Sequence, residues 1–550
     1  MKKITLFFFI LLSQIIFGQV KLSETQKLSA TCKVWGFLKY YHPKVANGDF
    51  NWDKQLFEVL PKIEQAKTKE EFSLILENWI DSLGEVKEIA PIIQPKEIEY
   101  FNKNFDLSWI DKSKLFSKKL SKKLKFIENN RFQGEQHYVE NEGGAGNISV
   151  KNENYTEYQF NDKNERILAL STYWNLMEYF FPYKYLMDKK WDTTLEEMLP
   201  AFIQAKNLDD FYVAMQKLTI RLNDSHVVFY KYAKKRHYLP VACKIIDEKM
   251  VVTEILDDYL TKTDGVKVGD IITKVNDKTV KEIILEYRDL ICASNEAFYL
   301  YKIVEPILSG YSDNIKLEFL KEGKYETKTI NCVDYNSNRY QLNKIQKEKF
   351  KKEKFKILEN NVGYVNMGEI TVKSIPEMIE KLKSTKAIFF DMRNYPNGTY
   401  EVISNFLNAK EKPFVIYTIL DLSHPGKFKW TKSRSIGSEN NSNYKGKVVV
   451  LLNEESISQS EWTAMCFQTA DNTTIIGSQT AGADGNVSNV DYMKAFHSQF
   501  TGLGVYYPNK KETQRIGIIP DIEVKPTIKG IQEGRDEVLD RAIKFIETGK

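Results

Sequence analysis

The chain has 550 residues, more than one hydrophobic core usually organises, so we expect about three or four domains. Hydrophobic residues make up 42% and charged residues 28%, a composition of globular proteins and not of disordered chains. The net charge is only +5 and the two signs are interspersed, which excludes the basic stripe of a nucleic-acid-binding protein. The five cysteines show no C-x-x-C spacing and indicate neither a disulfide framework nor a zinc site.

The N-terminus has the pattern of a secretory signal peptide, predicted over residues 1–18. Lys2 and Lys3 precede an apolar run from Ile4 to Phe17, and a small residue precedes the predicted cleavage site at Gln19. The run is shorter than the roughly 20 residues of a membrane span, although an uncleaved anchor is the alternative. We therefore expect a periplasmic or secreted protein with no membrane span in its mature form.

Two segments of the first half repeat each other at a constant offset, because Trp35 aligns with Trp174 (174 − 35 = 139). Apolar side chains recur at helical spacing in both copies. We predict two helical units of about three helices each, over residues 20–93 and 165–237, which serve as a scaffold. The same offset aligns further pairs: Ala30 with Ala169, Tyr40 with Tyr179, Pro43 with Pro182, Trp52 with Trp191 and Phe72 with Phe211.

The two copies differ where they end. At the constant offset, Lys87 of the first copy stands opposite His226 of the second, which follows Ser225. The second copy has thus placed a titratable imidazole where the first has an ordinary surface residue. An imidazole titrates near neutral pH, so this position is a candidate for chemistry.

Two regions without helical periodicity flank the second copy. Residues 94–164 are rich in Lys, Asn, Glu and Gly, and are predicted to be a linker or a small β region. Residues 238–335 begin with strand-like runs such as Met250–Ile255, and then Asp264–Asp277 reads DGVKVGDIITKVND. That string resembles a PDZ motif, which implies a domain that binds extended peptides by strand addition. The alternative is a domain that only spaces or gates its neighbour.

From about Tyr340 to the C-terminus, residues 340–550, strands and helices alternate. This indicates an α/β domain, in which sites form beyond the carboxyl ends of the strands. The predicted strands are Val362–Val365, Ala387–Asp391 and Val448–Leu452, and the predicted helices are Ile375–Lys383 and Ser460–Ala470.

Four motifs follow one another in this domain: Asp391–Gly398 (DMRNYPNG), Asn453–Trp462 (NEESISQSEW), Gly477–Gly485 (GSQTAGADG) and Gly517–Val524 (GIIPDIEV). In this order they resemble the C-terminal-processing and tricorn-core family of serine peptidases. The resemblance extends over the PDZ-like region to the C-terminus. The expected fold is multidomain α+β: helical N-terminal repeats, a PDZ-like β domain, and a catalytic α/β domain of the ClpP/crotonase type.

The resemblance assigns the nucleophile to Ser458, the middle serine of an S-x-S-x-S-E string. A serine at a turn from strand to helix is exposed. The neighbouring serines of the string, Ser456 and Ser460, are instead interpreted as residues that cap the helix. Glu461 is expected to cap or orient and not to react.

The same turn offers an oxyanion site. The backbone N–H of Gln459 lies at a helix N-terminus, which favours negative charge. The resemblance places a second donor in a glycine pair, which reads Asn397-Gly398 here. Because the first glycine is replaced, we assign the donor to Gly398.

The assignment of the general base starts from a lysine of the family that this chain lacks. The better-known branch of the family uses a lysine downstream of the nucleophile, and that position holds Ala483, which cannot accept a proton. The tricorn-like branch uses a serine–histidine pair from an N-terminal segment, and Ser225-His226 fits it. His497, in the catalytic domain, is the runner-up. The remaining histidines are weaker candidates: His42, His137, His237 and His424.

The resemblance also implies a late glutamate that orients the base. Glu512 is the only acidic residue just before the GIIPD string and is assigned this role, although the family spacing falls on Gln514. Two residues along a strand share one face, so either position suits the same site.

We expect an exported serine-type endopeptidase of the C-terminal-processing, tail-specific kind that acts on polypeptides, with the PDZ-like module capturing or gating substrate. The motifs require no cofactor and no metal. A catalytically inactive peptide- or ligand-binding relative of the same fold is the alternative. An esterase is disfavoured because a G-x-S-x-G elbow is missing.

Overall fold

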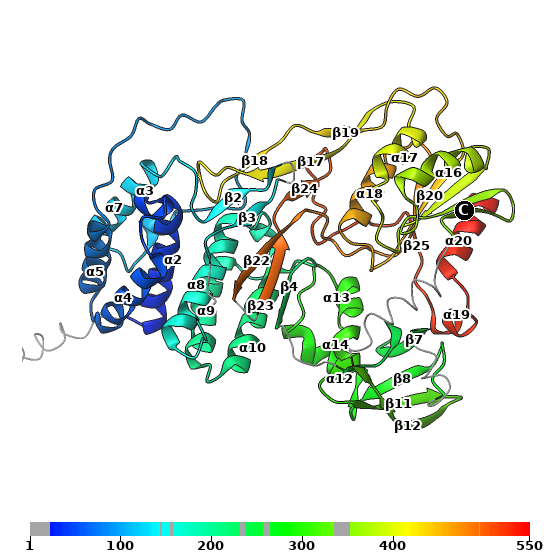
Figure 1. The fold of residues 1–550 in the computed structure, drawn as a ribbon, viewed down its shortest axis with the longest axis horizontal. Coiled ribbons are helices and arrows are strands. Elements are labelled where there is room, and N and C mark those ends of the chain that lie inside the picture. Colours follow the sequence, from blue (N-terminus) through cyan, green and yellow to red (C-terminus); the bar gives the residue numbers. More distant parts are fainter. Residues whose placement is uncertain are drawn as a thin grey trace, which may run out of the picture.

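The structure is a computed structural model that describes residues 22–143, 146–153, 158–231, 237–256, 265–334, 353–493 and 496–550. The molecule is elongated, with the helical half at one end, the α/β half at the other, and the PDZ-like domain beneath the latter (Figure 1). The predicted signal peptide lies outside the described residues. Within the described ranges, no helix combines the length and the apolar character of a membrane span.

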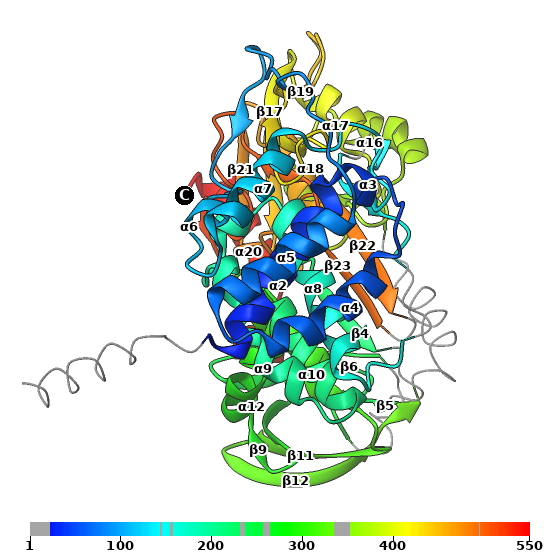
Figure 2. The ribbon, with the colours of Figure 1, turned by 90° about the vertical axis from the view of Figure 1, so that its left-hand side faces the viewer.

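The predicted repeat is two copies of one helical unit, which face the viewer in Figure 2. In the first copy the indole N–H of Trp35 donates to the carbonyl of Trp52 at 3.1 Å, and the reverse bond is also 3.1 Å. Trp174 and Trp191 repeat this exchange at 3.0 and 3.1 Å in the second copy. The helices are α2 (Glu24–Tyr41), α3 (Pro43–Ala46), α4 (Trp52–Gln65) and α5 (Lys69–Ser82), then α8 (Lys163–Phe180), α9 (Trp191–Gln204) and α10 (Leu208–Thr219).

The region between the copies contains short strands, as predicted, but also two helices, α6 (Trp109–Lys112) and α7 (Lys118–Asn129). Although its sequence is rich in lysine, α7 has an apolar face. Leu120, Leu124 and Ile127 recur on it at helical spacing and are buried. The strands are β1 (Tyr100–Phe101), β2 (Val139–Asn141) and β3 (Ile148–Val150).

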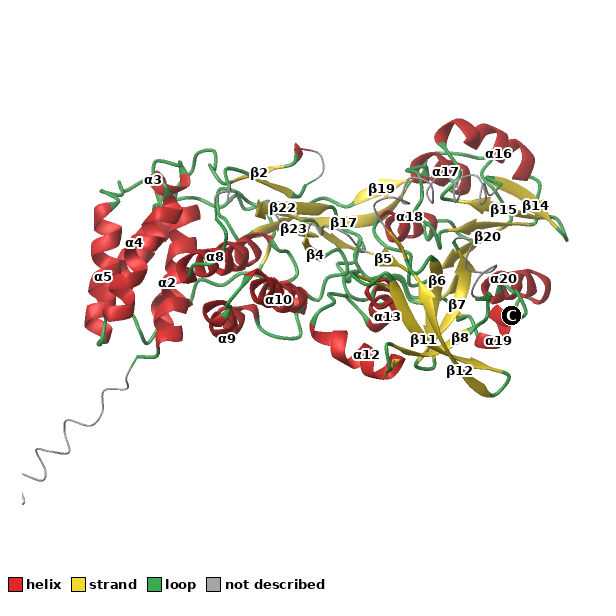
Figure 3. Cartoon of the chain, turned by 60° about the horizontal axis from the view of Figure 1, so that its bottom comes forward, coloured by secondary structure: helices red, strands yellow, loops and turns green. Residues whose placement is uncertain are grey.

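The region predicted to be PDZ-like, called the PDZ-like domain below, contains a sheet of order β12-β11-β8-β7-β6, with β9 added to β8. Its glycine-containing turn is held as the sequence motif indicates, since the Asp270 carboxylate accepts the N–H of Lys267 at 3.0 Å. Strand β6 lies at an edge of this sheet (Figure 3). The elements are β5 (His237–Tyr238), β6 (Val241–Ile246), β7 (Lys249–Ile255), β8 (Ile271–Val275), β9 (Lys278–Thr279), α12 (Val280–Glu286), α13 (Glu296–Lys302), α14 (Val304–Leu308), β10 (Ser309–Gly310), β11 (Asn314–Lys321), β12 (Lys324–Asn331) and β13 (Val333–Asp334).

The C-terminal domain is built on a sheet of order β14-β15-β16-β20-β21-β25, parallel except for β14. Strand β16 is buried at every position, as a central parallel strand covered on both faces must be. The elements are β14 (Phe355–Leu358), β15 (Val362–Asn366), α16 (Ile375–Leu382), β16 (Ala387–Asp391), α17 (Tyr400–Leu407), β20 (Lys447–Leu452), α18 (Gln459–Phe467), β21 (Thr473–Gly477), β25 (Ile522–Glu523), α19 (Ile528–Gln532) and α20 (Glu537–Thr548).

Two smaller sheets join this domain to the helical half. One has the order β1-β18-β17-β19, with β24 on β17. The other has the order β22-β23-β4, and β4 begins two residues after His226. Pairing of β4 with β23 therefore carries the end of the second helical copy into the C-terminal domain. Their bounds are β4 (Val228–Lys231), β17 (Lys412–Leu420), β18 (Phe428–Trp430), β19 (Arg434–Ile436), β22 (Val487–Met493), β23 (Phe496–Thr501) and β24 (Gly504–Tyr506).

Candidate active site

Ser458 occupies a strained turn between β20 and α18. Its backbone has φ 58° and ψ −117°, a region that side chains other than glycine rarely adopt. The flanking serines are both engaged: the Ser456 hydroxyl donates to the carbonyl of Met392 at 2.8 Å, and that of Ser460 to the carbonyl of Asn394 at 3.0 Å. They anchor the turn to the segment after β16, as structural residues would. Ser458 is the half-buried serine between them.

The segment 480–484 lies against this turn. The backbone N–H of Ser458 donates to the carbonyl of Ala483 at 2.9 Å. The buried Glu461 carboxylate accepts the N–H groups of Gly482 at 2.8 Å and Ala483 at 2.9 Å, and it also accepts the Thr480 hydroxyl. The expectation that Glu461 orients its surroundings thus has a concrete form, because it clamps this segment to α18.

The serine that precedes the predicted base contacts the same segment. The Ser225 hydroxyl donates to the carbonyl of Ala481 at 2.7 Å and accepts the N–H of Ser294 at 2.9 Å. Ser458 and the Ser225-His226 pair are therefore fixed to carbonyls only two residues apart, at 483 and 481. Ser225, the residue before His226, and the backbone of Ser458 therefore contact the same short segment.

His226 is almost fully buried, with 6% of its surface exposed. Its Nδ1 lies 2.9 Å from the hydroxyl of Thr501, which in turn donates to the Asp224 carboxylate at 2.9 Å. Burial lowers the pKa of His226, Asp224 raises it, and Lys302 lowers it further. The histidine is thus favoured as a neutral imidazole, which is the form a general base requires.

Glu512 is placed elsewhere. It forms a β-bridge with Tyr506, and its carboxylate lies 3.9 Å from Lys103 Nζ at the surface. The buried amide of Gln514 instead donates to Asp224 at 3.0 Å. The contacts of Glu512 do not support the prediction that it orients His226, and the family position falls on Gln514. The carboxylate nearest His226 in the hydrogen-bond network is Asp224, which the Asp-Ser-His triplet in the sequence signalled and sequence reasoning missed.

Gly398, a predicted oxyanion donor, lies close to the side chain of Gln459, the other predicted donor residue. Gly398 has φ +65°, and a side chain placed there would lie 3.3 Å from Nε2 of Gln459. Asn397, which replaces the first glycine of the pair, turns its amide to the carbonyls of Gly368 at 2.7 Å and Ile370 at 3.2 Å. It pins the loop and leaves Gly398 beside the N-terminus of α18.

His497, the alternative base, lies on β23 in register with Tyr230 of β4. Thr501 is on the same strand and makes the contact to His226. The structure thus brings the strand of the alternative base to the site, where Thr501 contacts the His226 ring and the Gln499 amide donates to the His226 carbonyl at 3.0 Å.

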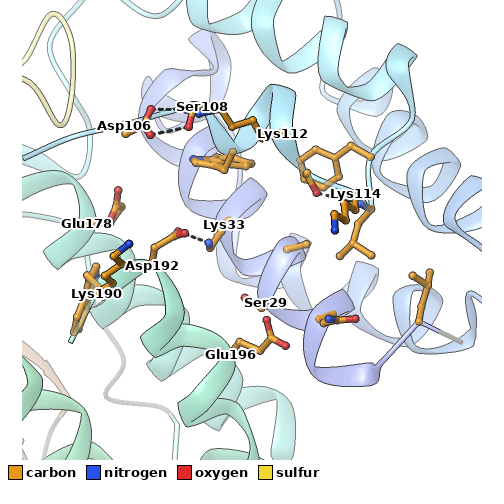
Figure 4. Close-up of a pocket in the computed structure, with 18 of the residues that line it drawn as sticks. Ser29, Lys33, Asp106, Ser108, Lys112, Lys114, Glu178, Lys190, Asp192 and Glu196 are labelled. Carbon is orange, nitrogen blue, oxygen red and sulfur yellow. Dashed lines mark hydrogen bonds and ion pairs between the residues drawn. The ribbon is translucent and has the colours of Figure 1, made fainter. Parts of the chain in front are cut away.

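A cavity of about 1240 Å³ lies between the two helical copies, lined by parts of α2, α9 and residues 103–116 (Figure 4). Among its charged residues, Lys33 pairs with Asp192, and Asp106 accepts the Ser108 hydroxyl at 2.6 Å. No predicted catalytic residue lines it. The cavity is therefore a feature of the scaffold and separate from the candidate active site.

The chain resembles known proteins in its fold and, over part of the C-terminal domain, in its sequence. The mature CPAF structure with lactacystin superposes with a TM-score of 0.58 at 13% identity, covering 70% of this chain and 99% of that chain. Another mature CPAF structure gives 0.56 at 14% identity, covering 70% and 99%. At such identities the likeness concerns the fold alone. No curated protein sequence matches the chain. Residues 361–524 match the model of peptidase family S41, so this segment is similar to that family of serine peptidases.

Proposed function

We propose that the protein is an exported serine endopeptidase that cleaves polypeptides, with Ser458 as nucleophile and His226 as general base. The observation that carries this proposal is that Ser458 and Ser225, the residue before His226, bind one short segment through the carbonyls of Ala483 and Ala481. A nucleophile and a base from distant parts of the chain are thereby held in fixed relation, as covalent catalysis requires.

In the proposed reaction, Ser458 Oγ attacks the scissile carbonyl while His226 Nε2 takes its proton. The oxyanion that forms is stabilised by the backbone N–H groups of Gln459 and Gly398. His226 then gives the proton to the leaving amine, and the C–N bond breaks. Water hydrolyses the acyl-enzyme by the same sequence, and Ser458 is regenerated.

The PDZ-like domain is proposed to capture or gate substrate. In the strand order of the described residues, β6 is an edge strand, to which an extended peptide could add. Strand β6 also contacts the loop that precedes Ser458. Residues 1–18 are proposed to direct export, with a mature protein that begins near Gln19. N-terminal sequencing of the native protein would test export, and an intact Met1 on cytosolic material would contradict it.

Labelling with a fluorophosphonate probe tests the function directly. The wild-type protein should be labelled at Ser458 and should digest denatured casein into fragments with new internal termini. Ser458→Ala should abolish both. A correctly folded wild-type protein that neither labels nor digests would instead be the inactive, peptide-binding relative.

A further inference from the structure

Asp224 is a buried carboxylate of the candidate site that accepts several hydrogen bonds. Its Oδ1 accepts the Thr501 hydroxyl at 2.9 Å, the Gln514 amide at 3.0 Å and the backbone N–H of His226 at 3.1 Å. Its Oδ2 accepts the backbone N–H of Thr501 at 2.8 Å. Asp224 has no exposed surface, so four donors hold a buried acceptor in one orientation.

This arrangement determines where the proton of His226 lies. A threonine hydroxyl has one proton, and Thr501 donates it to Asp224. The Thr501 oxygen can then only accept from the histidine, whose Nδ1 is 2.9 Å away. Nδ1 must therefore carry the proton of the neutral ring, which leaves the lone pair on Nε2.

We propose that Asp224 is the acidic positioning residue of this site and that it acts on His226 through the hydroxyl of Thr501. The proposal rests on the proposed function, because it concerns how the base of that reaction is held. Gln514, at the position where the family resemblance implies an orienting glutamate, donates its amide to Asp224 and helps to fix the carboxylate.

The relay has a role in both states of the histidine. In the resting enzyme it selects the tautomer whose Nε2 accepts the proton of Ser458. After that transfer both ring nitrogens carry protons, Nδ1–H still donates to Thr501, and the Asp224 charge stabilises the imidazolium. Lys302 on α13 acts against this stabilisation, because its positive charge lowers the pKa of His226. Its Nζ donates to the carbonyls of Val227 at 2.8 Å and Cys292 at 3.3 Å.

Thr501→Val tests the relay, because it keeps the shape of the side chain and removes the hydroxyl. We expect kcat to fall about 100-fold or more with KM little changed, since the wrong tautomer costs up to about 10⁴ in a serine peptidase. Thr501→Ser should recover most of the activity. Thr418→Val, at another fully buried threonine, on β17, is the matched control and should behave as wild type.

A second variant separates this relay from a glutamate-based site. Gln514→Glu would restore the acid of the family but place a second carboxylate against Asp224, so activity should fall. A gain in activity would overturn the proposal.

The pH dependence of kcat/KM gives a further test, because it would not change if Thr501 had only a structural role. Loss of the link to Asp224 destabilises the imidazolium, so the rising limb of Thr501→Val should shift to lower pH.

The outcomes distinguish the relay from the function on which it rests. If the wild-type protein does not react with the fluorophosphonate probe, the proposed function fails. If it reacts, and folded Thr501→Val keeps its kcat and its pH limb, the relay is overturned while the function stands. Equal losses in Thr501→Val and Thr501→Ser would also overturn it. Should Thr501→Val not fold, Thr501→Ala replaces it, with the same expected losses.

Discussion

Ala483 accepts the backbone N–H of Ser458 at 2.9 Å, so the position at which the other branch of the family has its lysine lies beside the nucleophile. The methyl group of Ala483 cannot take a proton, so a base must come from elsewhere. The same segment binds Ser225 through the carbonyl of Ala481. We therefore expect the base to be the imidazole of His226, which follows Ser225 in the second helical copy.

Ser458→Ala should lower kcat by roughly 10⁴- to 10⁶-fold, because no neighbouring side chain can replace the nucleophile. Ser458→Gly should be equally inactive. It should also be more stable than Ser458→Ala, by about 1 kcal/mol, because glycine adopts the φ of 58° without strain. Denaturant unfolding of the two variants measures the difference. Retained turnover in Ser458→Ala together with loss in Ser456→Ala would place the nucleophile elsewhere.

The rate should rise with pH through a pKa below the usual 6.5 of histidine. Burial lowers the pKa of His226, and a general base is active in its neutral form, above its pKa. The kcat/KM of a chromogenic peptide from pH 4 to 8 measures this limb. His226→Ala should remove it and cost nearly as much as Ser458→Ala, with the double variant little worse. A limb in the range of a lysine would contradict the assignment.

Much of the site was predictable because its motifs are local. The strands before the motifs at Asp391 and Asn453, the turn at Ser458 and the histidine that departs from the repeat could all be read within short windows of sequence. The PDZ-like turn around Asp270 was equally local. Such features depend on residues that are neighbours in the chain, and pattern reasoning handles them well.

The parts that could not be predicted depend on pairing between distant segments. Thr501 reaches His226 only because β23 pairs with β4, and nothing in either sequence specifies that register. The choice of Glu512 assumed a regular strand, on which residues two apart share a face. The segment is instead a turn, with positive φ at Lys510 and Arg515, so Glu512 and Gln514 point to different surroundings.

Asp484 should make stability depend on pH. Burial and the neighbouring Glu461 raise its pKa to about 8, and its Oδ2 has no hydrogen-bond partner among the described residues. The folded protein thus keeps a proton that the unfolded chain loses near its ordinary pKa of 3.8. The stabilisation from this group is complete below about pH 4 and is lost as pH rises through about 8.

Asp484→Asn, which resembles the protonated side chain, should remove this dependence. From pH 5 to pH 8, the melting temperature of the variant should rise relative to that of the wild type. Asp540→Asn, on the exposed side of α20, is the control. A constant difference between variant and wild type across this range would show that Asp484 is ionised throughout.

Lys244 connects the PDZ-like domain to the nucleophile turn. It lies on β6, and its Nζ pairs with Glu454 and, at 3.1 Å, with Glu455. Both carboxylates stand in the loop between β20 and Ser458. Glu454 is also held by the hydroxyl of Ser478 at 3.1 Å, so the lysine joins a network that fixes this loop. We therefore predict that movement of the PDZ-like domain changes the position of the nucleophile.

Lys244→Gln should therefore lower kcat on short peptides and long polypeptides alike, because it releases the loop and leaves partly buried carboxylates without their cation. A domain that only captures substrate would affect long polypeptides alone, since short peptides do not need its binding energy. Lys274→Gln is the control, because Lys274 pairs with Glu318 within the PDZ-like domain at 3.0 Å. A double-mutant cycle with Glu454→Gln should give a coupling of about 1–3 kcal/mol. Unchanged kcat on short peptides would show that the contact captures substrate without activating the site.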